Sequence, residues 1–460
     1  MNAAMYTANT AEPHKVDAIP RGHQVRSGST PVWIGETLRF STDGLESYFF
    51  SSWRPDLYDL LVVAGAIEFC DVSFGRPALG WARNFEVRVA VHDPHLWSQP
   101  SVVHALVAAA GFLTGDIWSF DFVPRKRAVG GIRQGSLDLP SGAQVIMPYS
   151  DGLDSRAVAA IVEAKEKSGL VRVRLGNFGA DRRSHNQRTR PFAVVPYEIS
   201  LGKHARRESS ARSRGFKFAA ITGIAATLAR VKRIVVTESG QGALGPVLAV
   251  TGQAYPDYRV HPAFTARMES LFNALFQNSI SFEYPRLWHT KGETLAAAAA
   301  LGSFDWTDTR SCWQSSRQTG FQGHRRQCGV CAACMLRRMS MFTANLNEPA
   351  SSYIWENLSA ATIRDGAVRG FSRHTTAMDE YAIAGVLHLD HMAEMADGKI
   401  FEAILSRSAG ELSRALEQNR ELMLQNIKHL LARHRYEWQR FLGSLSPKSF
   451  VRHIALTPVT

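Results

Sequence analysis

Hydrophobic and polar positions follow two different rhythms through the middle of the chain. Short apolar runs at 144–150, 171–179 and 233–237 are typical of buried strands, while 151–169 and 215–230 have apolar residues at helical spacing. Strands that alternate with helices predict an α/β fold with a parallel sheet covered by helices. Such a sheet binds ligands beyond the carboxyl ends of its strands, so we expect the chemistry there.

The flanking segments have other patterns. Residues 1–30 lack periodicity, which predicts a flexible tail, and residues 31–140 mix both rhythms, which predicts a small α+β accessory domain. Residues 346–460 have apolar positions at spacings of three and four, which predicts a helical C-terminal region. Within the accessory domain we expect strands at 85–91 and 117–123 and a helix at 101–113.

Charge is unevenly distributed along the 460 residues. Lys and Arg number 53 against 41 Asp and Glu, a formal net charge of +12. Ten of these cations fall between 182 and 217, where two glutamates oppose them. This segment is read as a solvated lid, a phosphate-facing flap or a nucleic-acid track, and sparse aromatic residues disfavour the last. No apolar stretch approaches the ~20 residues of a bilayer span. We therefore expect a cytoplasmic protein without a membrane partner.

The first chemical signal is a turn, Ser150-Asp151-Gly152-Leu153-Asp154-Ser155, between a predicted strand and a predicted helix. Backbone N–H groups of such a turn and the positive end of the helix form an anion site, to which serine hydroxyls add donors. It lacks the lysine of a P-loop and the glycines of a dinucleotide fingerprint. The alternative is a glycine that only satisfies turn geometry.

The second signal is a cysteine cluster in a chain with five cysteines. Cys312, Cys328, Cys331 and Cys334 have the spacing C-x15-C-x2-C-x2-C, which predicts a closed, structural zinc site. An iron–sulfur cluster is the chemical rival, and buried apolar cysteines are the plain alternative. Cys70 stands alone and is expected in a core.

Together the turn and the cysteine cluster indicate a protein family much more specifically than either does alone. The turn resembles the PP-loop of the ATP pyrophosphatase superfamily, and the cysteine pattern, preceded by W-x4-S-C at 306–312, resembles the 7-cyano-7-deazaguanine synthase family. The likeness covers about residues 143–345. It also includes Tyr-Pro-Asp at 255–257 and Thr-Lys-Gly-Glu at 290–293.

The resemblance implies an enzyme that uses ATP and Mg²⁺ to adenylate a 7-carboxy-7-deazaguanine-type carboxylate and joins it to nitrogen as an amide or nitrile. Adenylation requires backbone donors and cations at the α-phosphate. A guanine-like base presents paired N–H donors that a carboxylate can accept, for which Asp257 is the first choice and Glu238 the second. The ATP-binding residues are Ser150, Gly152, Leu153, Asp154 and Ser155, the catalytic residues are Asp154, Ser155, Lys291 and Arg214, and Arg259 joins Asp257 and Glu238 as substrate-binding.

The chain also departs from the family. Asp151, Gly215 and Tyr258 replace the family's Gly, Asn and Cys, and a longer glycine-rich stretch follows Glu238, where we expect a loop beside the substrate. Long synthase-like chains are similar to proteins of bacterial antiphage defence clusters, which implies ammonia or a protein amine as acceptor and partner proteins of a defence system. The alternatives are a tRNA-modifying PP-loop enzyme and an inactive zinc-containing scaffold.

Overall fold

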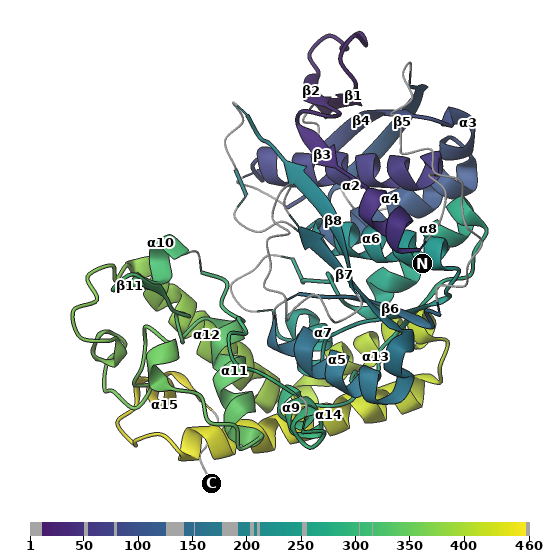
Figure 1. The fold of residues 1–460 in the computed structure, drawn as a ribbon. Helices are drawn as coiled ribbons and strands as arrows, with labels where there is room; N and C mark the ends of the chain where they lie inside the picture. The colour runs from purple at the N-terminus through teal and green to yellow at the C-terminus, as the bar shows by residue number, and fades with distance from the viewer. Residues whose placement is uncertain are drawn as a thin grey trace. The chain divides into compact units, whose positions relative to one another are not determined.

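The chain divides into two compact units (Figure 1). The first consists of Met1–Tyr149, Glu166–Val236 and Asp257–Glu283, and the second of Ser150–Lys165, Thr237–Pro256 and Tyr284–Thr460. The structure is a computed structural model, and it describes residues 12–49, 54–77, 81–125, 142–150, 152–176, 192–202, 207–208, 212–250, 255–302, 304–314 and 316–456.

The core sheet of the first unit has the order β10-β9-β6-β7-β8-β3. Its parallel strands are β6 (Val145–Pro148), β7 (Leu170–Gly176), β8 (Phe192–Ile199), β9 (Arg233–Val235) and β10 (Ser281–Glu283). The chain runs outward from β6 through β7 and β8, then returns to β9 on the other side of β6. The prediction of a parallel α/β core is confirmed, and its switch point lies between β6 and β9, where such sheets bind ligands.

The accessory region before the core has a sheet of its own, in the order β2-β1-β4-β5. Its strands are β1 (His14–Ile19), β2 (Thr30–Trp33), β4 (Asn84–Val91) and β5 (Ile117–Pro124), and every pair is parallel. The expected strands and helix are present, the helix as α4 (Pro100–Thr114). The all-parallel pairing makes this region α/β rather than α+β.

Two further details differ from expectation. β1 lies inside the segment expected as a tail. It is an inner strand of the sheet, and its last four residues are fully buried. β3 (Leu38–Phe40) belongs to the predicted accessory segment but pairs antiparallel with β8 of the core sheet. Accessory segment and core therefore share one folded unit.

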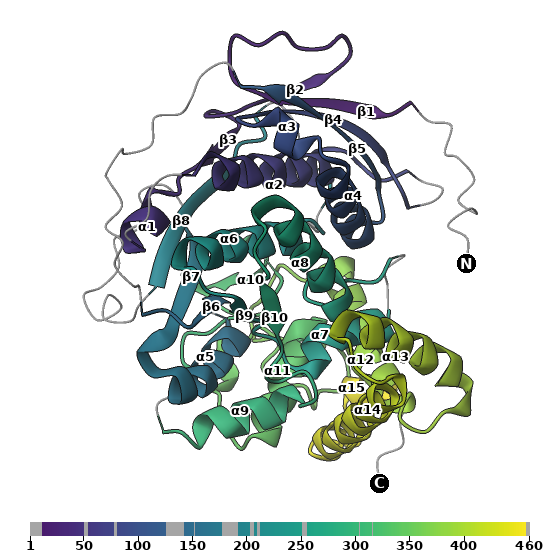
Figure 2. The ribbon, with the colours of Figure 1, turned by 90° about the vertical axis from the view of Figure 1, so that its right-hand side faces the viewer.

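Helix α2 (Pro55–Ser73) holds the two sheets of this unit together. Every residue from 57 to 73 is buried, and the helix packs on β1, β3, β4 and α6 (Arg214–Ala229). Figure 2 shows α2 and α4 covering one face of the accessory sheet. A helix surrounded on all sides has no polar stripe, which is why periodicity does not reveal it.

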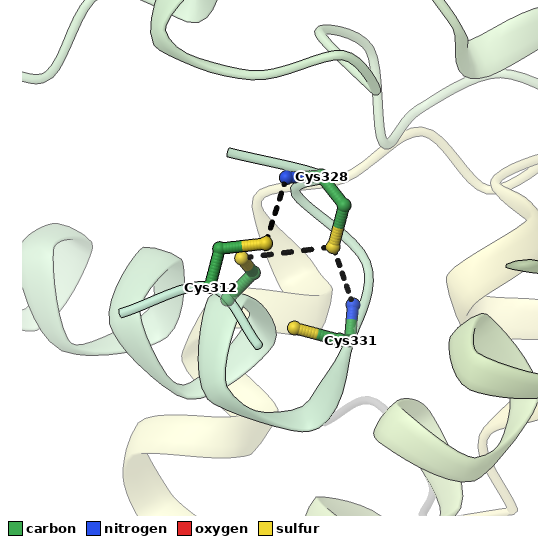
Figure 3. Close-up of side chains that lie close together, drawn as sticks. Cys312, Cys328 and Cys331 are labelled. Atoms are coloured by element: carbon green, nitrogen blue, oxygen red, sulfur yellow. Dashed lines mark hydrogen bonds between the residues drawn. The ribbon is translucent and has the colours of Figure 1, made fainter. Parts of the chain in front are cut away.

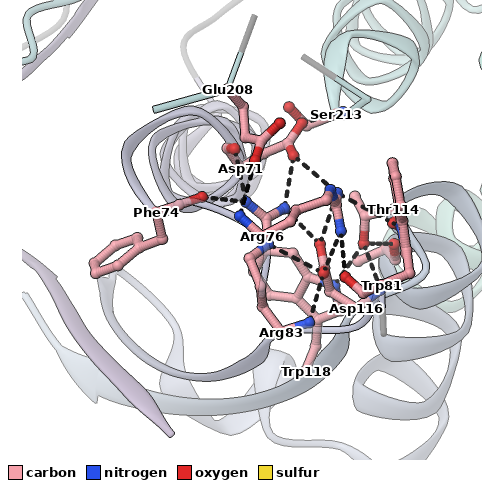
Figure 4. A network of polar contacts seen from close by, with 11 residues as sticks. Asp71, Phe74, Arg76, Trp81, Arg83, Thr114, Asp116, Trp118, Glu208 and Ser213 are labelled. Carbon is pink, nitrogen blue, oxygen red and sulfur yellow. Dashed lines mark hydrogen bonds and ion pairs between the residues drawn. The ribbon is translucent and has the colours of Figure 1, made fainter. Parts of the chain in front are cut away.

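A buried polar network pins the end of α2 to the start of α6 (Figure 4). The Arg83 guanidinium contacts Asp71 at 2.8 Å and Asp116 at 2.7 Å, and all three side chains are almost fully buried. Asp71 also accepts a hydrogen bond from the backbone N–H of Ser213 at 2.8 Å. The network thus fixes the residues that immediately precede Arg214.

The second unit is mainly helical. Its longer helices are α5 (Leu153–Glu166, up to Lys165), α7 (Gly240–Leu248), α9 (Lys291–Ala299), α11 (Ala332–Thr343), α12 (Thr376–Glu394), α13 (Glu402–Leu416) and α14 (Arg420–Gly443). Shorter elements are α10 (Ser316–Thr319), β11 (Gly320–Phe321), β12 (His324–Arg325) and α15 (Phe450–Ile454), while the first unit adds α1 (Asp43–Tyr48), α3 (Pro94–Trp97) and α8 (Pro262–Phe276). The predicted helical C-terminal region is confirmed.

This helical region shares its core with the cysteine cluster. Cys331 and Cys334 pack in one apolar cluster with Trp355, Trp438 and other side chains of the C-terminal region. A Cβ added at Gly385 of α12 would lie 2.6 Å from the carbonyl oxygen of Val330, so glycine allows α12 to press on the cysteine turn. In the described part of the chain, no helix has both the length and the hydropathy needed to cross a bilayer.

Candidate functional site

The predicted site residues fall in both units. Arg214, Asp257 and Arg259 belong to the first, while the turn after β6, Glu238, Lys291 and the four cysteines belong to the second. Asp151 and six of the ten cations between 182 and 217 lie outside the described residues.

The turn at 150–155 continues directly from β6 into α5. The Ser150 and Ser155 hydroxyls lie 3.0 Å apart, and the N–H of Gly152 donates to Ser150 Oγ at 3.2 Å. A Cβ at Gly152 would lie 3.0 Å from that hydroxyl, so glycine leaves room for it. Leu153 buries its side chain against α9 and α11, which fixes the first turn of α5. Two hydroxyls therefore gather at the positive end of a 14-residue helix, a favourable place for phosphate.

Asp154 and Lys291 meet in this unit. Lys291 Nζ lies 2.5 Å from Asp154 Oδ2, and the two side chains are only 6% and 17% exposed. The other carboxylate oxygen, Asp154 Oδ1, is buried and has no hydrogen-bond partner among the described residues. The structure thus brings together two of the predicted catalytic residues and leaves one acceptor atom available.

Lys291 is held by the way α9 begins. Thr290 caps the helix: its hydroxyl accepts from the N–H of Glu293 at 3.0 Å, and its N–H donates to the Glu293 carboxylate at 2.8 Å. This is a capping box, which satisfies two backbone donors at once. The Lys291 N–H donates to Gln241 Oε1 at 2.7 Å.

In the first unit, Asp257 and Arg259 pair with each other. Arg259 Nε lies 2.9 Å from Asp257 Oδ1 and Arg259 Nη2 lies 2.5 Å from Asp257 Oδ2, a bidentate contact. Burial alone would raise the pKa of the Asp257 carboxyl, but Arg259 and Arg212 hold it below its usual value. Burial, together with the nearby Arg259, lowers the pKa of Arg214. Three arginines and one carboxylate therefore form a net positive cluster at the start of α6.

Two departures from the family motif have packing explanations here. A Cβ at Gly215 would lie 2.6 Å from the carbonyl oxygen of Arg259, so only glycine lets that backbone approach α6. The centroid of the Tyr258 ring lies 4.4 Å from the centroid of the Phe112 ring of α4. Both replacements fit the close packing of this unit, and Tyr258 in particular contacts the accessory region.

Glu238 precedes a helix instead of the expected loop. Most of the glycine-rich stretch is α7, and residues 251–254 lie outside the described residues. A Cβ at Gly245 would lie 2.8 Å from the Met392 sulfur, and one at Gly240 would overlap the carbonyl of Leu287. The glycines therefore serve close packing, and the Glu238 carboxylate lies over the first turn of α7, beside Gly242.

The four predicted metal ligands converge, and Figure 3 labels three of them, Cys312, Cys328 and Cys331. Their sulfur atoms all lie within 4.8 Å of one another, and Cys328 Sγ is 3.8 Å from Cys334 Sγ. Tetrahedral zinc with bonds of about 2.3 Å requires sulfurs about 3.8 Å apart. Thiolates of a multi-iron cluster bind different iron atoms and must be spaced more widely. The cluster is therefore the right size for a single ion such as zinc.

The surroundings of the cysteines also fit a metal. Cys312 Sγ accepts the N–H of Cys328 at 3.2 Å, and Cys328 Sγ accepts the N–H of Cys331 at 3.3 Å. Such backbone donors stabilise thiolate ligands. Hydrogen bonds from the other three cysteines hold the pKa of the Cys312 thiol well below its usual value. Gly329, at φ +93°, makes the turn between two ligands possible.

Three residues around the first turn of α9 belong to no motif that the sequence analysis could recognise. Gln241 of α7 bonds to Lys291, while Glu437 and His434 of α14 contact Thr290 and Gln241 respectively. α14 lies far from the motifs in sequence, so spacing alone could not reveal them.

Comparison with known proteins finds relatives of one part of the chain. Residues 224–345 match the family described as Queuosine biosynthesis protein QueC. The 7-cyano-7-deazaguanine synthases of Cupriavidus taiwanensis and Cupriavidus necator are each 33% identical over 106 residues, which are 22% of this chain and 43% of theirs. The synthase of Methanoregula boonei is 30% identical over 95 residues, 21% and 39% of the two chains. The chain thus spans less than half the length of these relatives.

The matched region contains the cysteines, Glu238, Asp257, Arg259 and Lys291, while the turn at 150–155 and Arg214 precede it. The resemblance predicted from the motifs is confirmed for one part of the chain: residues 224–345 are similar to the 7-cyano-7-deazaguanine synthases.

Proposed function

We propose that this protein is an ATP-dependent carbon–nitrogen ligase that adenylates a 7-carboxy-7-deazaguanine-type carboxylate and transfers the acyl group to an amine. Three features support the proposal: a serine-lined turn at a helix start, an Asp154–Lys291 pair beside it in the chain's second unit, and kinship with the synthases. The first unit separately contains the arginine cluster, whose charge suits an anionic ligand.

The observation that carries the proposal is the state of Asp154. One oxygen binds Lys291, and the other is buried without a hydrogen-bond partner among the described residues. A buried carboxylate oxygen is costly unless it meets a donor or a cation. Asp154 would therefore hold Mg²⁺, which neutralises phosphate charge when bound.

The remaining steps need only the chain's own residues. An oxygen of the substrate carboxylate attacks the α-phosphorus of ATP, and pyrophosphate leaves with the electrons of the broken P–O bond. The hydroxyls of Ser150 and Ser155 donate to phosphate oxygens, and Lys291 offsets the charge that develops on them. An unprotonated amine then attacks the acyl carbon, AMP leaves with the electrons of the broken C–O bond, and the nitrogen releases one proton to solvent.

The acceptor in this proposal is ammonia or an amine on a partner protein. Antiphage defence is the setting that the likeness to long synthase-like chains suggests. Any amine placed close to the activated carbonyl can form the amide, so the acceptor depends on positioning rather than on new chemistry.

Pyrophosphate release is the direct test. The full-length protein is incubated with ATP, Mg²⁺ and 7-carboxy-7-deazaguanine, with and without ammonium. We expect release that depends on the deazaguanine, and its loss in Asp154→Asn, which keeps the size of the side chain. Silence of the wild-type protein with ATP binding intact would favour the scaffold, and release that requires tRNA would favour the tRNA-modifying enzyme.

The zinc site has a structural role in this proposal. Four cysteine ligands leave no open position for a substrate, so the ion would stabilise the fold rather than act on the reactants.

A further inference from the structure

Helix α14 of the C-terminal region contacts the first turn of α9, which carries Lys291. Glu437 accepts a hydrogen bond from the Thr290 hydroxyl at the N-terminal cap of α9. Glu437 is 4% exposed, and Thr290 is fully buried. The contact joins two residues that are 147 positions apart in the chain.

A second chain of hydrogen bonds reaches the same turn. His434 Nε2 lies 2.7 Å from the carbonyl oxygen of Leu389, and His434 Nδ1 lies 2.8 Å from Gln241 Nε2. Because a carbonyl only accepts, Nε2 carries the proton, and Nδ1 must accept from the Gln241 amide. Gln241 is thereby turned so that its oxygen faces the N–H of Lys291.

The two side chains that form these hydrogen bonds are buried, and the His434 ring has the protonation state that the geometry requires. His434 is completely buried, and burial lowers its pKa to about 4, so the ring is neutral as the contact to Gln241 demands. Gln241 is 1% exposed. Buried polar chains that are fully satisfied specify a single arrangement.

Packing at the neighbouring glycine agrees. A Cβ at Gly292 would lie 3.0 Å from Glu437 Oε1 and 2.6 Å from Thr343 Cγ2. The glycine that follows Lys291 therefore lets α14 and α11 approach the first turn of α9.

We propose that Glu437 and His434 are positioning residues for the reaction: through Thr290 and Gln241 they fix the first turn of α9, so that Lys291 Nζ stays against Asp154. This inference rests on the proposed function. It assigns an active-site role to α14, which lies beyond the region shared with the synthases.

The test compares four proteins: wild type, Glu437→Ala, Glu437→Gln and Trp438→Phe. Glutamine keeps an oxygen that accepts from Thr290. The Trp438 change is the matched control, because it removes a neighbouring buried hydrogen bond, to Asp390, and keeps the side chain of Glu437 that contacts Thr290. We expect kcat of pyrophosphate release to fall at least about tenfold in Glu437→Ala, since a small misplacement of a reacting group is costly. Glu437→Gln should retain most of kcat, and Trp438→Phe should lower only thermal stability.

A second readout does not depend on activity. The rate at which an acylating reagent labels Lys291, followed by peptide mass spectrometry, reports how firmly the lysine is held. It should rise about tenfold in Glu437→Ala, because local opening becomes easier, and stay unchanged in the other two variants. An inactive wild type would remove the proposed function, and the labelling result would still decide the inference. Unchanged labelling and kcat in Glu437→Ala, or equal losses in Glu437→Gln, would overturn it.

Discussion

The carboxyl group of Glu437 is buried in the folded protein, where its ionised form is unfavourable. Burial raises its pKa to about 7, and Glu293 adds to this, although contacts with Thr290, Gln241 and Arg433 act in the opposite direction. One of its oxygens has no hydrogen-bond partner among the described residues. We predict that Glu437→Gln, which cannot ionise, stabilises the protein at alkaline pH.

The sign follows from proton binding. The pKa of an unfolded glutamate is about 4.3, so between that pH and 7 the folded protein keeps a proton that the unfolded chain has lost. The free energy of unfolding therefore falls as pH rises through this window and levels off above about 7. For a single group with these values, the loss is about 1 kcal/mol at pH 5 and about 3.5 kcal/mol at pH 8. Glutamine removes the loss, so the difference between variant and wild type should grow by about 2.5 kcal/mol.

Thermal unfolding at pH 5 and pH 8 measures this difference. A gain of about 2.5 kcal/mol corresponds to a rise in Tm of roughly 3–6 °C for a folding unit of a few hundred residues. Glu421→Gln is the matched control, since Glu421 is exposed at the first turn of the same helix. It shows what the same substitution does at an exposed position of the helix. A Glu437→Gln protein with the same Tm offset at both pH values would refute the reasoning, because the carboxyl would then ionise as freely as one in water.

Three further outcomes are expected. Cys331→Ser should release about one zinc per chain by elemental analysis, with no visible iron–sulfur absorption before or after, and should lower Tm markedly. Gly215→Asn, which restores the family residue, should destabilise by about 1–3 kcal/mol in denaturant titration, because its Cβ overlaps the backbone of Arg259. Arg83→Leu removes the cation that bridges two buried carboxylates and leaves them only Arg76, so it should cost about 3–5 kcal/mol, whereas substitution of the exposed pair Arg21–Glu36 should have little effect on stability.

Most elements that alternate cleanly in sequence were predictable. β6, α5, β7 and β9 lie within a few residues of the expected ranges, since each has one buried face and one exposed face or is a short apolar run between turns. α6 also lies at its expected range, although it is buried continuously from residue 219 to residue 228. Helix α2 was missed for the opposite reason, because it is buried on all sides. β1 was missed because an N-terminal strand owes its order to pairing with β2 and β4, which no local pattern records.

Site residues divide in the same way. The four cysteines were predictable because metal ligands must obey a spacing, and their sulfurs do converge. The catalytic roles of Asp154 and Lys291 were implied only by the family resemblance, and neither their pairing nor the bidentate contact between Asp257 and Arg259 was predicted. Contacts across 130 or more positions depend on tertiary packing, which has no sequence period.

The cysteine cluster and Lys291 are linked through helix α14, so we expect loss of zinc to affect Lys291. Cys331, Cys334 and Met339 lie in the same apolar cluster as Trp438 and Phe441 of α14. Glu437, next to Trp438, bonds to the cap of α9. Loss of the metal would loosen the cysteine turn and the helix that packs on it, and the first turn of α9 would lose its support. Zinc removal should therefore reduce kcat together with stability, although no zinc ligand belongs to the catalytic pair. A chelated protein that keeps full kcat while its Tm falls would separate the two and show that α14 keeps its place at the cap of α9 without the metal.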